Sequence, residues 1–213
     1  MTGKVVVLCT ANVCRSVYAA AMLDAVLAAQ GIAVASAGLA VRSSLPPCAL
    51  VLRRAEHEGL TVLQEDSRQV RTADLATADI VLVMTTAQRS AVARSQPLIR
   101  QRIFTLIEAA VVAQALAEQG VRNSTLQNHI AQMHRQRSSV DLPVVQDTRR
   151  VLGIVLRRSR HARTAISIED GHVSTARGEH QNSLNLVQKY TGQFLAAWSA
   201  QPWFTGSPTS EQP

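Results

Sequence analysis

The sequence predicts an α/β fold in which four parallel strands carry helices on both faces. Short apolar runs rich in β-branched residues alternate with segments whose apolar residues recur every three or four positions. Such alternation is typical of βαβ units and a parallel sheet. The chain has 213 residues, of which 46% are hydrophobic and 17% charged. This composition excludes a wholly disordered protein, and the length suits one α/β domain with extensions.

The first predicted strand, residues 5–8, is continuously apolar, which is typical of a strand buried on both faces of a parallel sheet. From Ser16 onward the apolar spacing changes to three and four residues, which predicts a helix that stops near Gly31. The next elements are expected as strands at 32–36, 80–84 and 102–106, with a helix at 49–58.

The C-terminal half has a mostly helical pattern. We expect helices at 107–119, 125–137, 148–158 and 179–200, which places the domain within residues 1–200. The segment 149–163 contains six arginines and no acidic residue. It is interpreted as a solvated helix face, with a docking surface for an acidic partner as the alternative. Residues 201–213 contain three prolines, and we expect them to form a disordered tail.

Composition also limits the function. The formal charge is +7, but aromatic residues make up only 3% of the chain, which argues against stacking on a single-stranded nucleic acid. No apolar run approaches the roughly 18 residues of a membrane span, so we expect no membrane partner. The N-terminus shows no export signal, and three cysteines cannot form a disulfide framework. We therefore expect a cytoplasmic protein.

The residues with the clearest chemical pattern are 9–16, Cys-Thr-Ala-Asn-Val-Cys-Arg-Ser, between the first strand and the first helix. A loop of this length can direct successive backbone N–H groups into one concavity, which binds a tetrahedral oxyanion. Arg15 can add a bidentate grip on two phosphate oxygens. The helix N-terminus and this arginine both favour the thiolate form of Cys9.

This arrangement predicts phosphomonoester hydrolysis. The Cys9 thiolate would displace the leaving oxygen and form a phosphocysteine, which water then hydrolyses. The reaction needs no cofactor. We expect no metal site, because Cys9 and Cys14 lack a second pair of Cys or His at ligand spacing.

The segment 6–16 resembles the opening of low-molecular-weight protein tyrosine phosphatases, as do Ser36-Ala37-Gly38 and residues 78–84. The resemblance covers about residues 4–106 and implies a flavodoxin-like sheet of the phosphotyrosine phosphatase I type. It also implies a tyrosine phosphatase acting on a phosphotyrosine protein.

By this resemblance, Cys9 is the nucleophile, Arg15 holds the phosphate, and Ser16 is a hydroxyl partner of the thiolate. Asn12 would hold the loop in an unusual backbone state with support from Ser36. Cys14 resembles the family's redox partner for Cys9, or is a small buried side chain. The resemblance implies the following substrate-binding set: Thr10, Ala11, Asn12, Val13, Cys14, Ser16 and Ser36.

The family's general acid is an aspartate followed by proline late in the chain, and this sequence has no Asp-Pro pair. We assign the acid to Asp170, which is followed by glycine, with Asp141 and Asp147 as alternatives. His172 could relay the proton or be a surface histidine. The choice of Asp170 makes residues of about 120–165 a helical, arginine-rich insertion in the family fold.

Some features depart from the family pattern. The histidine usually found shortly before Ser67 is absent, with Glu65 or Asp66 nearby, and the loop 39–47 has no aromatic residue. A non-catalytic phosphate or phosphoprotein binder is one alternative function. Arsenate reduction is another, but it requires a further thiol around residues 84–96, and Cys48 could serve only if its loop reached the site.

Overall fold

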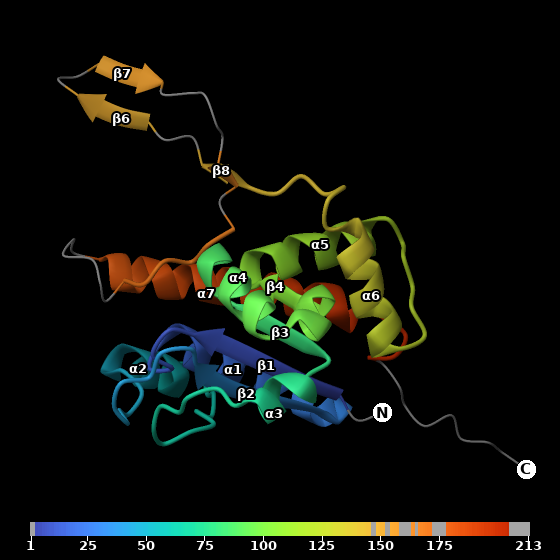
Figure 1. Ribbon diagram of the computed structural model, residues 1–213, viewed down its shortest axis with the longest axis horizontal. Helices are drawn as coiled ribbons and strands as arrows, with labels where there is room; N and C mark the ends of the chain where they lie inside the picture. Colours follow the sequence, from blue (N-terminus) through green and yellow to red (C-terminus); the bar gives the residue numbers. More distant parts are fainter. Residues whose placement is uncertain are drawn as a thin grey trace, which may run out of the picture.

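Four parallel strands form the central sheet of the protein (Figure 1). The computed structural model describes residues 3–145, 148–151, 154–157, 163–164, 166–171 and 178–204. The strand order is β2-β1-β3-β4. The bounds are Gly3–Cys9 for β1, Ile32–Gly38 for β2, Ile80–Val83 for β3 and Ile103–Thr105 for β4. The predicted parallel α/β sheet is confirmed.

The helices confirm most of the predicted pattern and add some that the sequence analysis missed. Residues 72–76, 86–95 and 97–102 form short helices where none was expected. The helices are α1 (Arg15–Leu27), η1 (Ala28–Gln30), α2 (Ala49–His57), α3 (Thr72–Ala76), α4 (Thr86–Ser95), η2 (Pro97–Arg102), α5 (Leu106–Glu118), α6 (Leu126–Gln136) and α7 (Glu179–Ser199). Within the described ranges, none of them combines the length and apolar character that crossing a membrane requires.

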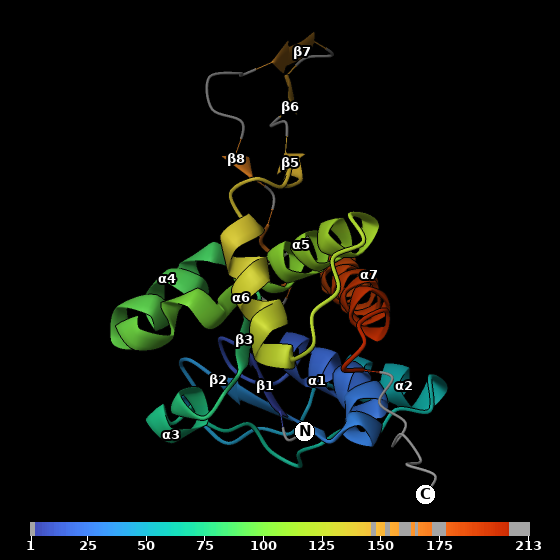
Figure 2. The same ribbon diagram turned by 90° about the vertical axis from the view of Figure 1, so that its right-hand side faces the viewer.

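Helices cover both faces of the sheet because side chains along β1 alternate between them. Val5 and Val7 face a core built with α1, α5 and α7. Val6 and Leu8 face a second core, built with α3, α4 and η2. Figure 2 shows α5 and α7 running side by side over the first of these faces. All four β1 side chains are fully buried, which explains the continuous apolar run.

The loop between β1 and α1 lies at the carboxyl ends of the strands, beside the point where the strand order reverses. Strand β1 has β2 on one side and β3 on the other, so the connections leave in opposite directions. Open α/β sheets bind ligands at this position. Gly38, at the end of β2, permits the loop to approach closely, since a Cβ there would lie 2.8 Å from the Thr10 carbonyl oxygen.

The predicted helix at 148–158 is wrong. Strands β6 (Thr148–Val151) and β7 (Ile154–Arg157) form an antiparallel pair in its place, and β5 (Val144–Val145) pairs with β8 (Arg163–Thr164). In both views the β6–β7 pair stands away from the sheet and its helices (Figures 1 and 2). The segment contains β-branched residues that favour a strand. Within the described part of the insertion, α6 is the one helix.

The predicted tail begins too early. Gln201 and Phe204 are buried, and the Gln201 side chain bonds to the backbone of Val121 and Asn123. Trp203 packs edge-on against Trp198 of α7. These aromatic contacts bury apolar surface that composition alone did not reveal. Residues 205–213 of the predicted tail lie outside the described residues.

A buried carboxylate at the start of α5 ties this helix to α4 and to the chain after α6. Glu108 is 2% exposed and forms ion pairs with Arg89 and Arg137 at 2.7 and 2.8 Å. Burial alone would raise the pKa of Glu108, but the two guanidinium groups outweigh it and hold the pKa below its ordinary value.

We expect Glu108→Gln to lower the free energy of unfolding by about 1–3 kcal/mol at neutral pH, because two partly buried arginines lose their counter-charge. A carboxyl whose folded-state pKa is lowered stabilises the fold above its unfolded pKa of about 4.3, and that contribution disappears as the pH falls through the folded value. The deficit, measured by urea unfolding, should therefore shrink below about pH 4. The matched control is Glu118→Gln at the exposed end of α5, where a change of less than about 0.5 kcal/mol is expected. An equal deficit at pH 7 and pH 3 would contradict this account.

Candidate active site

Residues 9–16 form a loop that surrounds the sulfur of Cys9. The Cys9 Sγ accepts a hydrogen bond from the backbone N–H of Asn12 at 3.2 Å, and the Ser16 hydroxyl lies 3.1 Å from it. Cys9 is the last residue of β1, and Arg15 is the first of α1, so the loop ends on a helix N-terminus. The sulfur therefore has one backbone N–H donor and one hydroxyl within hydrogen-bond distance.

Asn12 determines the path of this loop. Its φ of 56° is the only positive value at a non-glycine residue in the described part of the chain. Asparagine tolerates this left-handed conformation better than most residues. The side chain is fully buried, and its Nδ2 donates to the hydroxyls of Ser16 at 3.1 Å and Ser36 at 2.9 Å. The structure thus brings Asn12 and Ser36 together, as the resemblance implied.

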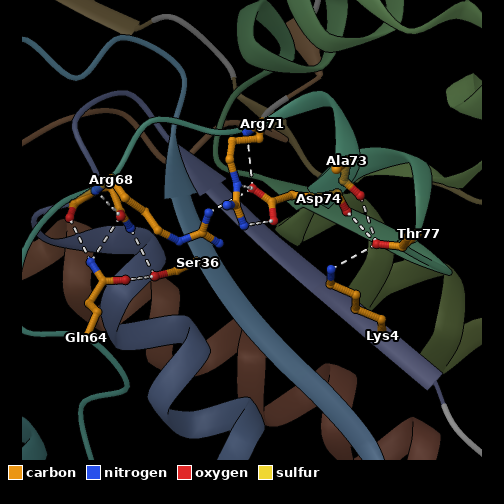
Figure 3. Close-up of polar contacts among 9 residues, drawn as sticks. Lys4, Ser36, Gln64, Arg68, Arg71, Ala73, Asp74 and Thr77 are labelled. Atoms are coloured by element: carbon orange, nitrogen blue, oxygen red, sulfur yellow. Dashed lines mark hydrogen bonds and ion pairs between the residues drawn. The ribbon is translucent and has the colours of Figure 1, made fainter.

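Gln64 completes the support of Asn12, and the sequence analysis missed it. The Gln64 amide donates to the backbone and side-chain oxygens of Asn12 at 3.1 and 3.0 Å, and its Oε1 accepts from the Ser36 hydroxyl (Figure 3). Glu65 and Asp66, which we had considered for this place, are exposed. The signal that could have identified Gln64 is chemical: a buried asparagine needs donors for its oxygen, and a primary amide can donate and accept.

An aspartate and two arginines hold the segment around residues 68–74 in place. The backbone N–H of Arg68 donates to Asn12 Oδ1 at 3.0 Å, and the Arg68 guanidinium pairs with Asp74 at 2.8 Å. Arg71 binds the same carboxylate (Figure 3). Burial raises the pKa of Asp74, but the hydrogen bonds from Arg71 and Arg68 outweigh it and hold the pKa well below the ordinary aspartate value. The cluster therefore stays charged at neutral pH and fixes the segment that supports Asn12.

Arg15 and Asp170 lie in contact, although 155 residues separate them in sequence. Arg15 is 3% exposed, and its Nη2 is 2.5 Å from Asp170 Oδ2. Its Nη1 donates to the carbonyl oxygen of Ile168 at 2.8 Å. Asp170 is about one-quarter exposed, so a carboxyl group next to the loop arginine remains open to solvent.

The segment 166–171 is attached at several points, which fixes Asp170 beside the loop. The Ile168 N–H donates to the carbonyl oxygen of Met84 at 2.7 Å, just after β3. The Ser183 hydroxyl of α7 donates to the carbonyl oxygen of Glu169. Gly171 packs against α7, since a Cβ there would lie 2.4 Å from the His180 Cα. A side chain at residue 171 would therefore clash with the backbone of α7.

The alternative acids do not share this position. Asp141 is exposed, and no contact with the loop 9–16 is found for it in the described structure. Asp147 and His172 lie outside the described residues. Among the described candidates, Asp170 is the carboxyl group that contacts the loop arginine.

The other predicted loop residues are Thr10, Ala11 and Val13. The Thr10 hydroxyl accepts from Gln88 Nε2 at 3.1 Å, and Gln88 also accepts from the N–H groups of Met84 and Thr85. Gln88 thus links the loop to the end of β3 and was not expected from the sequence. Ala11 and Val13 are half-buried.

Cys14 is buried, and its sulfur lies next to other polar groups. Its Sγ lies 2.9 Å from Nε2 of His180, and Cys48 Sγ lies 3.6 Å from the same nitrogen. A hydrogen bond with Cys48, together with burial, raises the pKa of Cys14, so it is a neutral thiol. The Cys48 N–H donates to the carbonyl oxygen of Val13, so the loop that carries Cys48 does reach the site.

Comparisons with known proteins place this fold and loop in a family. A model of the low molecular weight phosphotyrosine protein phosphatase family matches residues 4–118. The chain is 30% identical over 108 residues to the probable low molecular weight protein-tyrosine-phosphatase EpsP of Ralstonia nicotianae, covering 51% of this chain and 73% of the relative.

Two solved structures share the fold over more than nine-tenths of the chain. YfkJ from Bacillus subtilis aligns with a TM-score of 0.57 at 17% identity, covering 92% of this chain and 94% of that one. A protein tyrosine phosphatase from Entamoeba histolytica aligns with a TM-score of 0.58 at 13% identity, covering 93% and 97%. Since the family match spans more than half of the sequence, the chain belongs to the low molecular weight phosphotyrosine protein phosphatase family.

Proposed function

We propose that this chain is a phosphomonoester hydrolase that works through a phosphocysteine at Cys9, with protein phosphotyrosine as its substrate. The observation that carries the proposal is the contact between Arg15, at the end of the loop around Cys9, and the carboxyl group of Asp170. With this contact, the proposed nucleophile Cys9, the phosphate-binding Arg15 and the proposed acid Asp170 lie close together.

In the first step, Cys9 Sγ attacks phosphorus, so that an S–P bond forms and the bond to the leaving oxygen breaks. Asp170 donates its proton to that oxygen. In the second step, Asp170 takes a proton from water, the water oxygen attacks phosphorus, and the thiolate leaves. The loop N–H groups and Arg15 stabilise the charge on the phosphoryl oxygens throughout.

The choice of phosphotyrosine rests on the family's description and on the EpsP relative. A phenolate is also a better leaving group than the alkoxide of serine. The Arg15–Asp170 contact supports an enzyme over a non-catalytic phosphate binder, because a binder has no use for an acid at the phosphoryl site.

Cys9→Ser should abolish hydrolysis of an aryl phosphate, with a loss of more than about 10⁴-fold in kcat, as removal of a nucleophile does in other covalent enzymes. A serine hydroxyl can keep the hydrogen bonds from Asn12 and to Ser16, so the fold and phosphate binding should persist. Turnover and phosphate binding by calorimetry are the measurements. Glu118→Gln, at the exposed end of α5, is the control and should keep full turnover. Substantial turnover by Cys9→Ser would refute the mechanism.

Asp170→Asn should slow hydrolysis by about 10²-fold or more, and most strongly for poor leaving groups, because it removes the proton donor. Asparagine retains an oxygen that can accept from Arg15, but the buried guanidinium loses its counter-charge, so turnover is compared well below the Tm measured for the variant. The measurement is kcat over a series of aryl and alkyl phosphates of rising leaving-group pKa. Asp141→Asn, on an exposed side chain, should leave the series unchanged. If Asp141→Asn or Asp147→Asn produces the leaving-group effect, the assignment to Asp170 is wrong.

Gln64→Ala should lower kcat/KM by about 10-fold to 100-fold, because Asn12 loses two hydrogen-bond donors that hold the loop. Competitive inhibition by inorganic phosphate should weaken in parallel. Gln64→His, which can also donate and accept, should restore part of the loss. Gln69→Ala is the control, since the Gln69 amide bonds to Leu39 and Val41 outside the loop. Equal effects of Gln64→Ala and Gln69→Ala would show that Gln64 has no specific positioning role.

A further inference from the structure

Beside the loop, three side chains that bind transition metals meet from three remote elements. Cys14 precedes α1, Cys48 precedes α2, and His180 lies in the first turn of α7. Their ligand atoms all lie within 4.8 Å of one another. Cys14 is buried, and the other two residues are half-buried. No step proposed for the hydrolysis uses Cys48 or His180.

The distances from the imidazole nitrogen to the two sulfurs are close to those of a tetrahedral metal site. Metal bonds of about 2.3 Å to sulfur and about 2.0 Å to nitrogen place the two ligand atoms about 3.5 Å apart in tetrahedral geometry. Cys48 Sγ is already 3.6 Å from His180 Nε2. Cys14 Sγ, at 2.9 Å, needs to move by about half an ångström. Small side-chain rotations therefore suffice to admit an ion.

The donor set selects the class of ion. Two sulfurs and an imidazole nitrogen suit zinc and similar borderline-soft ions, whereas magnesium and calcium prefer oxygen ligands. Oxidation of Cys14 and Cys48 to a disulfide would require an oxidant, whereas binding of a divalent ion requires none. The convergence of His180 on both sulfurs favours a metal over a disulfide.

We propose that Cys14, Cys48 and His180 form a binding site for a zinc-class divalent ion, with a water molecule as the fourth ligand. On binding, the two thiols release their protons to solvent, two metal–sulfur bonds and one metal–nitrogen bond form, and no electron is transferred. This site is distinct from the Cys9 thiolate and does not depend on the hydrolytic mechanism.

An ion bound at this site would link parts of the structure on both sides of the Arg15–Asp170 contact. Cys14 adjoins Arg15 in sequence, and the His180 backbone packs against Gly171, the neighbour of Asp170. An ion at this point would join the start of α7 to the loop and to α2. Occupancy therefore stabilises the arrangement that holds Asp170 beside Arg15.

The test uses the full-length chain carrying Cys9→Ser, so that the proposed nucleophile cannot supply a ligand. The protein is kept reduced with a phosphine and titrated with Co²⁺ and then with Zn²⁺ against a chromophoric chelator. We expect one ion per chain, a thiolate-to-cobalt charge-transfer absorption, and a rise in Tm on addition of Zn²⁺. Adding Cys48→Ser or His180→Ala should weaken zinc binding by more than about 100-fold, since even outer partners of metal ligands contribute 10-fold to 100-fold. His57→Ala, an exposed histidine on α2, is the matched control and should change nothing.

The absence of stoichiometric binding in the Cys9→Ser chain would overturn the proposal. So would binding that survives both Cys48→Ser and His180→Ala, or a cobalt spectrum without thiolate charge transfer. Metal-free melting curves of the two variants show whether each folds, and Cys48→Ala provides a second removal of the same ligand.

Discussion

The left-handed backbone of Asn12 is the constraint on which the candidate site depends. A side chain in this conformation costs roughly 1–2 kcal/mol, so the surrounding structure has to impose it. Four residues bond to the buried amide: Ser16, Ser36, Gln64 and Arg68. The left-handed conformation directs the Asn12 N–H toward Cys9 Sγ. The bond from Asn12 to the sulfur is thus supported by residues spread over more than fifty positions of sequence.

A second long-range constraint brings Asp170 to the loop. The chain leaves the sheet after α5, passes through α6 and the β5–β8 and β6–β7 pairs, and returns at residues 166–171 along the carboxyl end of β3. The return is fixed by backbone bonds and by the close approach of Gly171 to α7. The intervening segment can therefore vary in length without moving Asp170, provided that both of its ends stay anchored.

The local parts of this fold were predictable, because they depend on neighbours in sequence. The apolar run of β1, the periodicity of α1 and the positive-φ glycine at residue 31 gave the first βα unit with nearly correct bounds. Helix α4 was missed because it is mostly polar and buries few of its residues, although the pair Thr85 and Gln88 forms a capping box that marks its start. The strands β6 and β7 were read as a helix, since short segments that mix arginine with Val, Ile and Leu suit either structure.

Contacts between remote segments could not be read from spacing. Gln64 supports Asn12 across 52 positions, and the resemblance had drawn attention only to Glu65 and Asp66 in this part of the sequence. Spacing could not reveal the proximity of Cys14, Cys48 and His180 either, since these residues meet only when the N-termini of α1, α2 and α7 converge. The assignment of Asp170, by contrast, used a family pattern late in the chain and agrees with its contact to Arg15.

The most direct test of the central claim is a crystal structure of the chain with vanadate, which mimics the phosphoryl group in transfer. The account predicts vanadium bonded to Cys9 Sγ, its equatorial oxygens on the backbone N–H groups of residues 10–15 and on the Arg15 guanidinium, and an Asp170 oxygen next to the apical ligand opposite sulfur. Vanadate bound away from the loop, or an Arg15 guanidinium that makes no contact with it, would contradict the account.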